Sequence, residues 1–271
     1  ASVGLELSPR ALRQFGAGMG YGAGLVLVTA LLSVAVGALH FEIAPQVSTA
    51  DIVNTGLFMF GAVLFEETLF RGYAFQRAVE GIGRRWALAV FAVIFLLAHP
   101  MDESMPPELM TIASANLLLA AVLLGQCMLR SGGLALPIGL HLGWNWMLQT
   151  LGFSISGKLA FDSIWHPVFN TSDQWLTGGP YGLEASALSL PVLLAAVAWS
   201  AQQWHHDRDQ SAGEMVGHRG RRVEAENARP GRRDSGRLGQ AYFLHQCRRE
   251  RRAAADRRQH RGQRTMAAQN R

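Results

Sequence analysis

Two adjacent glutamates, Glu66 and Glu67, lie within an apolar stretch that runs from residue 52 to residue 76. Neighbouring carboxylates cannot both remain charged and unpaired in an apolar environment, because the loss of hydration is too costly. Arg71 follows Glu67 by four residues, a spacing that allows a salt bridge on one helix. Glu66 then points about 100° away around the helix and is a candidate general base. The alternative is that these residues form only a structural ion pair.

His99 ends the next apolar stretch, residues 86–100, and the turn between the two stretches is centred near Gly81–Gly83. Glu66 and His99 are almost equally far from this turn along the chain. If the two stretches form an antiparallel helical hairpin, both side chains therefore lie at nearly the same depth. A histidine at that depth can serve as a partner of the glutamate in proton transfer.

His141 and Asn145 lie four residues apart in the apolar stretch 133–152, so they share one face of a helix. Two distances along the chain are equal: from His141 back to the arginine before its stretch, and from Glu66 forward to the arginine after its own stretch. The two residues are therefore expected at similar depth. One buried polar pair could simply hold two helices together, but polar groups that meet from three helices favour a functional site.

The residue types favour hydrolysis of an amide bond. Glu66 and His99 can hold a water molecule and take its proton, which makes a nucleophile for a carbonyl carbon. His141 and Asn145 can donate hydrogen bonds to the oxyanion that forms. The Glu67–Arg71 pair would fix the helix and the orientation of Glu66.

Other protease chemistries find little support. The sequence contains no HExxH motif of zinc proteases and no GxSxG motif of serine hydrolases. The four aspartates among residues 1–201 all lie in predicted loops, which disfavours an aspartyl protease within a membrane.

The elements that must position these residues are predicted to be membrane-spanning helices, because most of the apolar segments approach the ~20 residues that cross a bilayer. We therefore predict an all-α, polytopic bundle of about six spans. The segments are 17–39, 52–76, 86–100, 109–129, 133–152 and 183–204.

Charges in the connections between these segments predict their orientation. Basic and acidic connections alternate along the chain, and the basic ones are expected in the cytoplasm. Both termini are then cytoplasmic.

The charge balance also divides the chain. Residues 1–201 hold 8 basic and 12 acidic side chains, whereas residues 202–271 hold 17 arginines and 8 acidic side chains. We predict a transmembrane domain over 1–204 and a disordered, arginine-rich tail over 205–271. Because the positive charge belongs to the tail, the chain is not expected to bind nucleic acid.

These residues resemble the CPBP family, which includes the CAAX prenyl endopeptidases of the Rce1 type and many bacterial relatives. The family pattern is EExxxR, then FxxxH, then HxxxN or HxxxD. Here it reads Glu66-Glu67-Thr68-Leu69-Phe70-Arg71, Phe95-Leu96-Leu97-Ala98-His99 and His141-Leu142-Gly143-Trp144-Asn145. A later segment, Trp175–Glu184, is similar to a loop common in bacterial members. Glu184 is interpreted there as a charge at the start of a helix.

The resemblance implies a membrane-embedded peptidase in which Glu66 and His99 activate water and His141 and Asn145 stabilise the oxyanion. It leaves open whether a divalent metal such as zinc takes part; if so, Glu66, His99 and His141 are the expected ligands. The expected substrate is a membrane-associated protein or peptide. The Ala-, Gly- and Arg-rich composition suggests a bacterial protein of the inner membrane.

Two other functions stay open on the sequence. One is a non-proteolytic membrane protein of the same fold, such as a scaffold or an immunity protein against a peptide toxin. The other is a small transporter that uses Glu66, His99 and His141 as an ion path. A transporter needs polar residues spread along the membrane normal, whereas these are expected at one depth.

Overall fold

A computed structural model describes residues 4–5, 7–44, 48–102, 104–157 and 163–203. The arginine-rich tail predicted for residues 205–271 lies outside this part of the chain. The same holds for the predicted domain boundary after residue 204.

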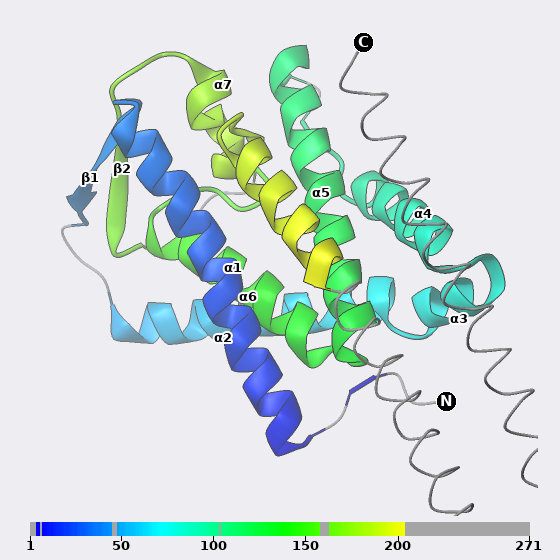
Figure 1. The fold of residues 1–271 in the computed structure, drawn as a ribbon. Helices are drawn as coiled ribbons and strands as arrows, with labels where there is room; N and C mark the ends of the chain where they lie inside the picture. The colour runs from blue at the N-terminus through cyan, green and yellow to red at the C-terminus, as the bar shows by residue number, and fades with distance from the viewer. Residues whose placement is uncertain (1–3, 6, 45–47, 103, 158–162, 204–271) are drawn as a thin grey trace, which may run out of the picture. The chain divides into compact units, whose positions relative to one another are not determined.

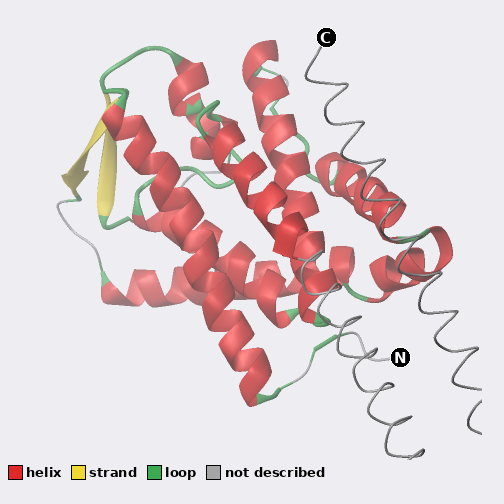
Figure 2. Ribbon diagram, viewed as in Figure 1, coloured by secondary structure: helices red, strands yellow, loops and turns green. Residues whose placement is uncertain are grey.

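Helices make up most of the described chain (Figures 1 and 2), which confirms the prediction of a mainly helical protein. The last helix covers residues 189–203 and therefore begins later than the predicted segment 183–204. The other helical elements are α1 (Pro9–Ala35), α2 (Thr49–Arg71), α3 (Tyr73–Ile82), α4 (Arg84–Leu97), α5 (Pro107–Ser131), α6 (Ala135–Thr150), α7 (Gln174–Thr177), η1 (Gly179–Tyr181) and η2 (Leu183–Ala185).

By length and apolar composition, the described residues contain three candidate membrane spans, Pro9–Ala35, Thr49–Ile82 and Pro107–Ser131. Six spans are therefore not confirmed. With 14 and 16 residues, α4 and α6 are shorter than the ~20 residues of a full span. The apolar run 133–152 extends beyond both ends of α6, and the run 86–100 extends past the C-terminal end of α4.

A two-stranded antiparallel sheet corrects the all-α prediction. Strand β1 (Leu39–Ile43) pairs with β2 (Trp165–Phe169), with Leu39 opposite Phe169 and Ile43 opposite Trp165. Residues 36–39, predicted as the end of the first helix, instead form a turn and enter this strand. The strand pairs with residues more than 100 positions away, so local periodicity could not reveal it.

Helices α1 and α6 pack with their backbones in close contact, because glycines recur at a spacing of four on both helices. A Cβ atom on Gly18 or Gly22 of α1 would lie 2.4 or 2.0 Å from a carbonyl oxygen of α6. On Gly139 or Gly143 of α6 it would lie 2.1 or 2.2 Å from a carbonyl oxygen of α1. This small-xxx-small packing is typical of membrane helices, and it fixes α6 against α1.

Helix α6 also packs against α2 and α5. In Figure 1, α2 crosses the direction of α1 and packs against α6, while α4 packs against α5. The chain bends at Gly72 between α2 and α3, and again at Gly83, whose φ of 80° lets α4 turn back against α3. This bend places the end of α4 near the C-terminal part of α2.

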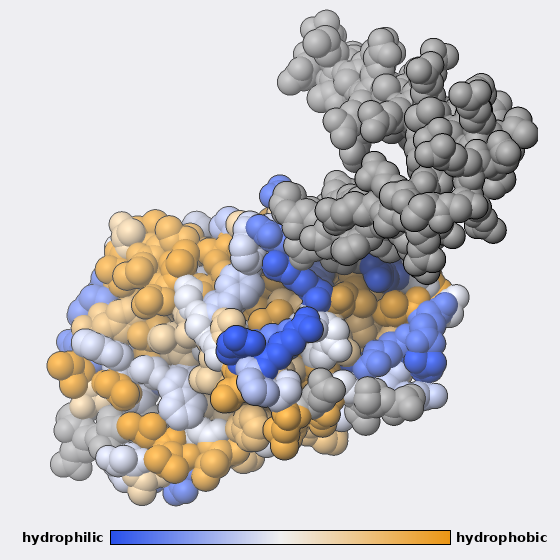
Figure 3. Space-filling view, turned by 60° about the horizontal axis from the view of Figure 1, so that its bottom comes forward, coloured by the Kyte–Doolittle hydropathy of each residue, from blue (hydrophilic) through white to orange (hydrophobic). Residues whose placement is uncertain are grey.

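Large apolar side chains cover much of the exterior. Figure 3 shows broad hydrophobic areas on the face that it draws, with hydrophilic residues gathered in its middle and at one side. On α2 and α4, Leu57, Phe58, Phe65, Trp86 and Leu97 are each more than 60% exposed. Such a surface is costly in water, so the protein is an integral membrane protein.

Candidate active site

The Glu67–Arg71 pair predicted on one helix is present and fully buried. Arg71 Nη1 donates to Glu67 Oε1 at 3.0 Å, and the two side chains are 2% and 0% exposed. Arg71 also reaches beyond α2: its Nη2 donates to the carbonyl of Ala121 on α5 at 3.3 Å, and its guanidinium stacks 4.5 Å from the ring centroid of Phe95 on α4. The pair therefore joins three helices.

Glu66 points away from this pair, as its position on the helix predicted. Its side chain is 31% exposed and faces two histidines, and its Oε2 lies 3.8 Å from Nε2 of His99 and 3.8 Å from Nε2 of His141. These distances are too long for direct hydrogen bonds. They leave Glu66 beside both rings with its oxygen atoms accessible from a cavity.

His99 lies just beyond the end of α4, where Pro100 prevents the helix from continuing. Its Nδ1 lies 2.7 Å from the carbonyl oxygen of Phe95, and its ring lies 4.2 Å from the Phe95 ring. A carbonyl only accepts hydrogen bonds, so Nδ1 carries the proton. Nε2 is thereby directed toward Glu66.

His141 on α6 is oriented by the second glutamate of the pair. Its Nδ1 lies 2.9 Å from Glu67 Oε1, the same oxygen that accepts from Arg71. Because a carboxylate paired with an arginine is an acceptor, Nδ1 donates and Nε2 points toward Glu66. Glu67 was predicted to fix the helix that carries Glu66; in the structure it also contacts His141 on another helix.

Glu66, His99, His141 and Asn145 all line one cavity of about 590 Å³. The structure thus brings the three predicted motifs together. Much of the remaining wall is apolar and comes from α2 and from the segment after α6, through Phe58, Met59, Phe65, Leu69, Phe70 and Ile155. Because Phe58, Phe65 and Leu69 are more than half exposed, the cavity opens at the apolar side of the molecule.

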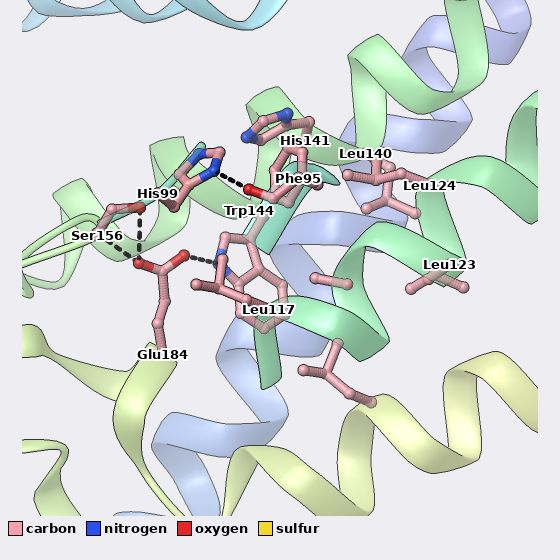
Figure 4. A pocket seen from close by; sticks show the side chains of 12 residues that line it. Phe95, His99, Leu117, Leu123, Leu124, Leu140, His141, Trp144, Ser156 and Glu184 are labelled. Carbon is pink, nitrogen blue, oxygen red and sulfur yellow. Dashed lines mark hydrogen bonds between the residues drawn. The ribbon is translucent and has the colours of Figure 1, made fainter. Parts of the chain in front are cut away.

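Sequence reasoning missed a second group of polar residues on the inner side of this site. A smaller cavity of about 40 Å³ is lined by both histidines and by Trp144, Ser156 and Glu184. Figure 4 shows the Glu184 carboxylate between the Trp144 indole and Ser156, close to His99. The only sequence signal for Glu184 was the resemblance of its loop to bacterial relatives.

Glu184 does not act simply as a charge at a helix start. Its Oε1 accepts from Trp144 Nε1 at 3.1 Å, and its Oε2 accepts from the backbone N–H of Ser156 at 2.5 Å. Burial raises the pKa of the Glu184 carboxyl above its ordinary value, whereas these two donors act in the opposite direction. The carboxylate is therefore an internal hydrogen-bond acceptor for two separate elements.

The fit of the site to a metal ion can be judged from its donor atoms. Ligands of a tetrahedral zinc ion lie about 2.0–2.2 Å from it and hence about 3.4 Å from one another. Glu66 Oε2 lies 3.8 Å from each histidine Nε2. Among the described residues, no three His, Cys, Asp or Glu side chains are arranged to hold a metal ion. The predicted ligands Glu66, His99 and His141 therefore do not form a zinc site as they stand.

Comparison with known families identifies the part of the chain that carries these motifs. Residues 47–147 match the family described as type II CAAX prenyl endopeptidase, Rce1-like. The match confirms the resemblance predicted from the three motifs, all of which it includes. Comparisons with curated proteins and with solved structures gave no match.

Proposed function

We propose that the protein is an intramembrane endopeptidase, because residues 47–147 match the Rce1-like family of type II CAAX prenyl endopeptidases. The proposed catalytic side chains come from α2, from the residues just after α4 and from α6. One observation carries the proposal: Glu66 Oε2 lies 3.8 Å from Nε2 of both His99 and His141 at the edge of one cavity. A water molecule fits between groups at this separation, because it hydrogen-bonds at about 2.8 Å.

Glu66 is the proposed general base. It is the more exposed of the two glutamates and faces the cavity, whereas Glu67 is buried in its pair with Arg71. Glu66 takes a proton from the water, His99 Nε2 holds the same water in place, and the resulting hydroxide attacks the carbonyl carbon of the substrate. His99 is suited to this role because Phe95 fixes its ring.

His141 and Asn145 are the proposed donors to the oxyanion. They are four residues apart on α6 and line the same cavity as Glu66. With Nδ1–H donated to Glu67, His141 must also carry a proton on Nε2 to donate, so the proposal requires the imidazolium form.

Collapse of the tetrahedral intermediate completes the reaction. The C–N bond breaks, and the proton held by Glu66 passes to the leaving nitrogen, which departs as an amine. The other product is a carboxylic acid, and Glu66 returns to its ionised state. No step of this sequence needs a group beyond the side chains named and one water molecule.

We propose a membrane-associated protein or peptide as the substrate, because the cavity opens among exposed apolar side chains of α2. We also propose that the protein lies in a bacterial inner membrane with both termini in the cytoplasm. The alternation of basic and acidic connections supports this orientation.

Cleavage of internally quenched peptides tests the proposal. The peptides would be apolar, about 20 residues long to match a membrane span, and presented in detergent micelles to the purified full chain. We expect cleavage by the wild type and a loss of about 10²–10⁴-fold in kcat for Glu66→Gln, the range that general-base catalysis provides.

Glu80→Gln is the matched control, because Glu80 is an exposed partner of Arg77 on α3, away from the cavity. Equal cleavage by Glu66→Gln and wild type would exclude Glu66 as the base. If folded wild type cleaved no peptide in a broad panel, the non-proteolytic scaffold or immunity function would be favoured instead.

A further inference from the structure

Glu184 connects two walls of the site that no other described carboxylate joins. One oxygen accepts from the Trp144 indole at 3.1 Å and the other from the Ser156 backbone at 2.5 Å. Trp144 belongs to α6, whereas Ser156 belongs to the segment that follows α6 and lines both cavities. The carboxylate thus bridges two parts of the chain at the inner side of the site.

Trp144 lies on the same helix as the two proposed oxyanion donors. It lies three residues after His141 and immediately before Asn145 on α6. Its side chain is only 7% exposed and reaches the Glu184 carboxylate (Figure 4). A hydrogen bond at this position restrains the rotation of α6 about its own axis, and that rotation sets the direction of both donors.

Ser156 needs an external support for its backbone. Its φ is 50°, and it is the only described residue other than glycine with a positive φ. This left-handed conformation is unfavourable for a residue with a Cβ. The N–H bond to Glu184 Oε2 supplies a charge-assisted partner that holds the conformation.

The backbone of Glu184 is itself bound by a side chain of α5, which restrains the position of its carboxylate. Asn116 Nδ2 donates to the carbonyl oxygens of Glu184 and Ser186 at 2.9 and 3.0 Å. The Ser189 hydroxyl donates to the carbonyl of Leu183 at 2.6 Å. These bonds fix the backbone of η2 and of the residue that follows it.

We propose that Glu184 is a positioning residue of the peptidase site, which aligns α6 through Trp144 and holds Ser156 in the cavity wall. This inference rests on the proposed function for its catalytic consequence, although the anchor itself does not. Glu184 is not among the residues that line the larger cavity with Glu66, so we assign it no contact with the reacting atoms. Its effect is expected on kcat through His141 and Asn145, with little effect on the apolar part of the cavity that binds substrate.

The first arm of the test measures the anchor without activity. Hydrogen exchange of the Ser156 amide would be followed by mass spectrometry in wild type, Glu184→Gln and the control Glu80→Gln. A glutamine can accept with only one atom, so Glu184→Gln should speed exchange at Ser156 by about tenfold or more, as expected when a charge-assisted bond is lost. Unchanged exchange would overturn the anchor, whether or not the protein cleaves peptides.

The second arm measures cleavage of the same quenched peptides. We expect Glu184→Gln to lower kcat by about 10–100-fold, as is usual for groups that orient a catalytic residue, with KM changed less than about threefold. Trp144→Phe keeps the aromatic ring but removes the donor, and it should lower kcat in the same way. Wild-type kcat in both variants would overturn the positioning role.

Substitutions at Ser156 provide the rescue. Glycine adopts positive φ without strain, so adding Ser156→Gly to Glu184→Gln should partly restore kcat relative to Glu184→Gln alone. Ser156→Val should impair kcat although Glu184 is intact, because a β-branched residue resists positive φ. Loss in Glu184→Gln without rescue by Ser156→Gly would contradict the proposed route through Ser156.

If the wild type cleaves none of the peptides, the proposed function fails for these probes. The exchange arm still decides whether Glu184 holds Ser156, so the two failures are distinguishable.

Discussion

His141 Nδ1 lies 2.9 Å from Glu67 Oε1, and that same oxygen accepts from Arg71 at 3.0 Å. The two adjacent glutamates therefore contact the same histidine from different sides, since Glu66 Oε2 faces Nε2 of His141 at 3.8 Å. Glu67 orients the His141 ring through Nδ1, and Glu66 faces the other ring nitrogen, Nε2. This division explains why a pair of carboxylates, rather than one, is found near the end of the apolar helix α2.

Glu67→Gln is expected to destabilise the folded protein, in addition to any effect on activity. The substitution leaves the Arg71 guanidinium buried without its counter-charge, which typically costs about 3–5 kcal/mol. Thermal unfolding in detergent measures this loss. The control Glu80→Gln removes an exposed ion pair and should change stability by less than about 1 kcal/mol. Equal melting temperatures for the two variants would contradict the structural role of Glu67.

Arg71→Lys tests whether the guanidinium shape matters beyond its charge. Lysine can pair with Glu67 but cannot also bond Ala121 and stack on Phe95 in the same way. We expect a loss of about 1–3 kcal/mol in the free energy of unfolding, measured by denaturant or heat. Arg77→Lys, at an exposed position, is the control. An unchanged free energy of unfolding in Arg71→Lys would show that the positive charge alone is sufficient for stability.

Because α1 and α6 pack closely, we expect a single methyl group added at their interface to lower stability strongly. In Gly143→Ala the new Cβ would lie 2.2 Å from the Met19 carbonyl oxygen, so the helices must separate. We expect a loss of about 1–3 kcal/mol and reduced activity, because His141 and Asn145 flank this glycine. Gly24→Ala, which has no atom within 4 Å of its new Cβ, should leave the melting temperature unchanged or slightly raised. A tolerated Gly143→Ala would argue against this interface.

Filling the cavity should block substrate without unfolding the protein. Ala62 lines the cavity on α2, and Ala62→Trp places a large ring there. We expect KM for apolar peptides to rise by about tenfold or more, as a lost binding contact does, with the melting temperature retained. Leu57→Trp, at an exposed position on the same helix, should leave KM unaltered. If both variants behaved alike, the peptide would bind elsewhere.

Chelation tests the metal question directly. Because the donor atoms do not form a zinc site as they stand, we expect cleavage to persist after dialysis against a strong chelator and to be unaffected by added zinc. Activity would be followed with the same peptides, and zinc content by atomic absorption. Loss of cleavage that zinc alone restores would show that Glu66, His99 and His141 rearrange around a metal.

Local spacing was sufficient to predict two relationships within the site. Glu67 and Arg71 are one helical turn apart, and the equal distances of Glu66 and His99 from the turn near Gly81–Gly83 predicted a common depth. Both relationships depend on helix geometry and on a short connection. They therefore follow from the chain itself, and the structure has both.

Contacts between distant segments were beyond such reasoning. Strands β1 and β2 pair across more than 100 residues, and α4 and α6 proved shorter than their apolar runs. Glu184 was interpreted as a charge at a helix start because nothing in its own neighbourhood pointed to Trp144 or Ser156. Which donors a carboxylate meets depends on how separate elements pack.

The sequence by itself thus determined the apolar helical character, the three motifs and the similar depth of Glu66, His99 and His141. Helical periodicity and the cost of unpaired charge in an apolar medium act locally, and so they can be read along the chain. Only the tertiary structure decided that Glu67 orients His141, that Arg71 joins three helices and that Glu184 anchors Ser156. Each of these depends on the rotation and separation of packed helices, which are set by side chains far apart in sequence.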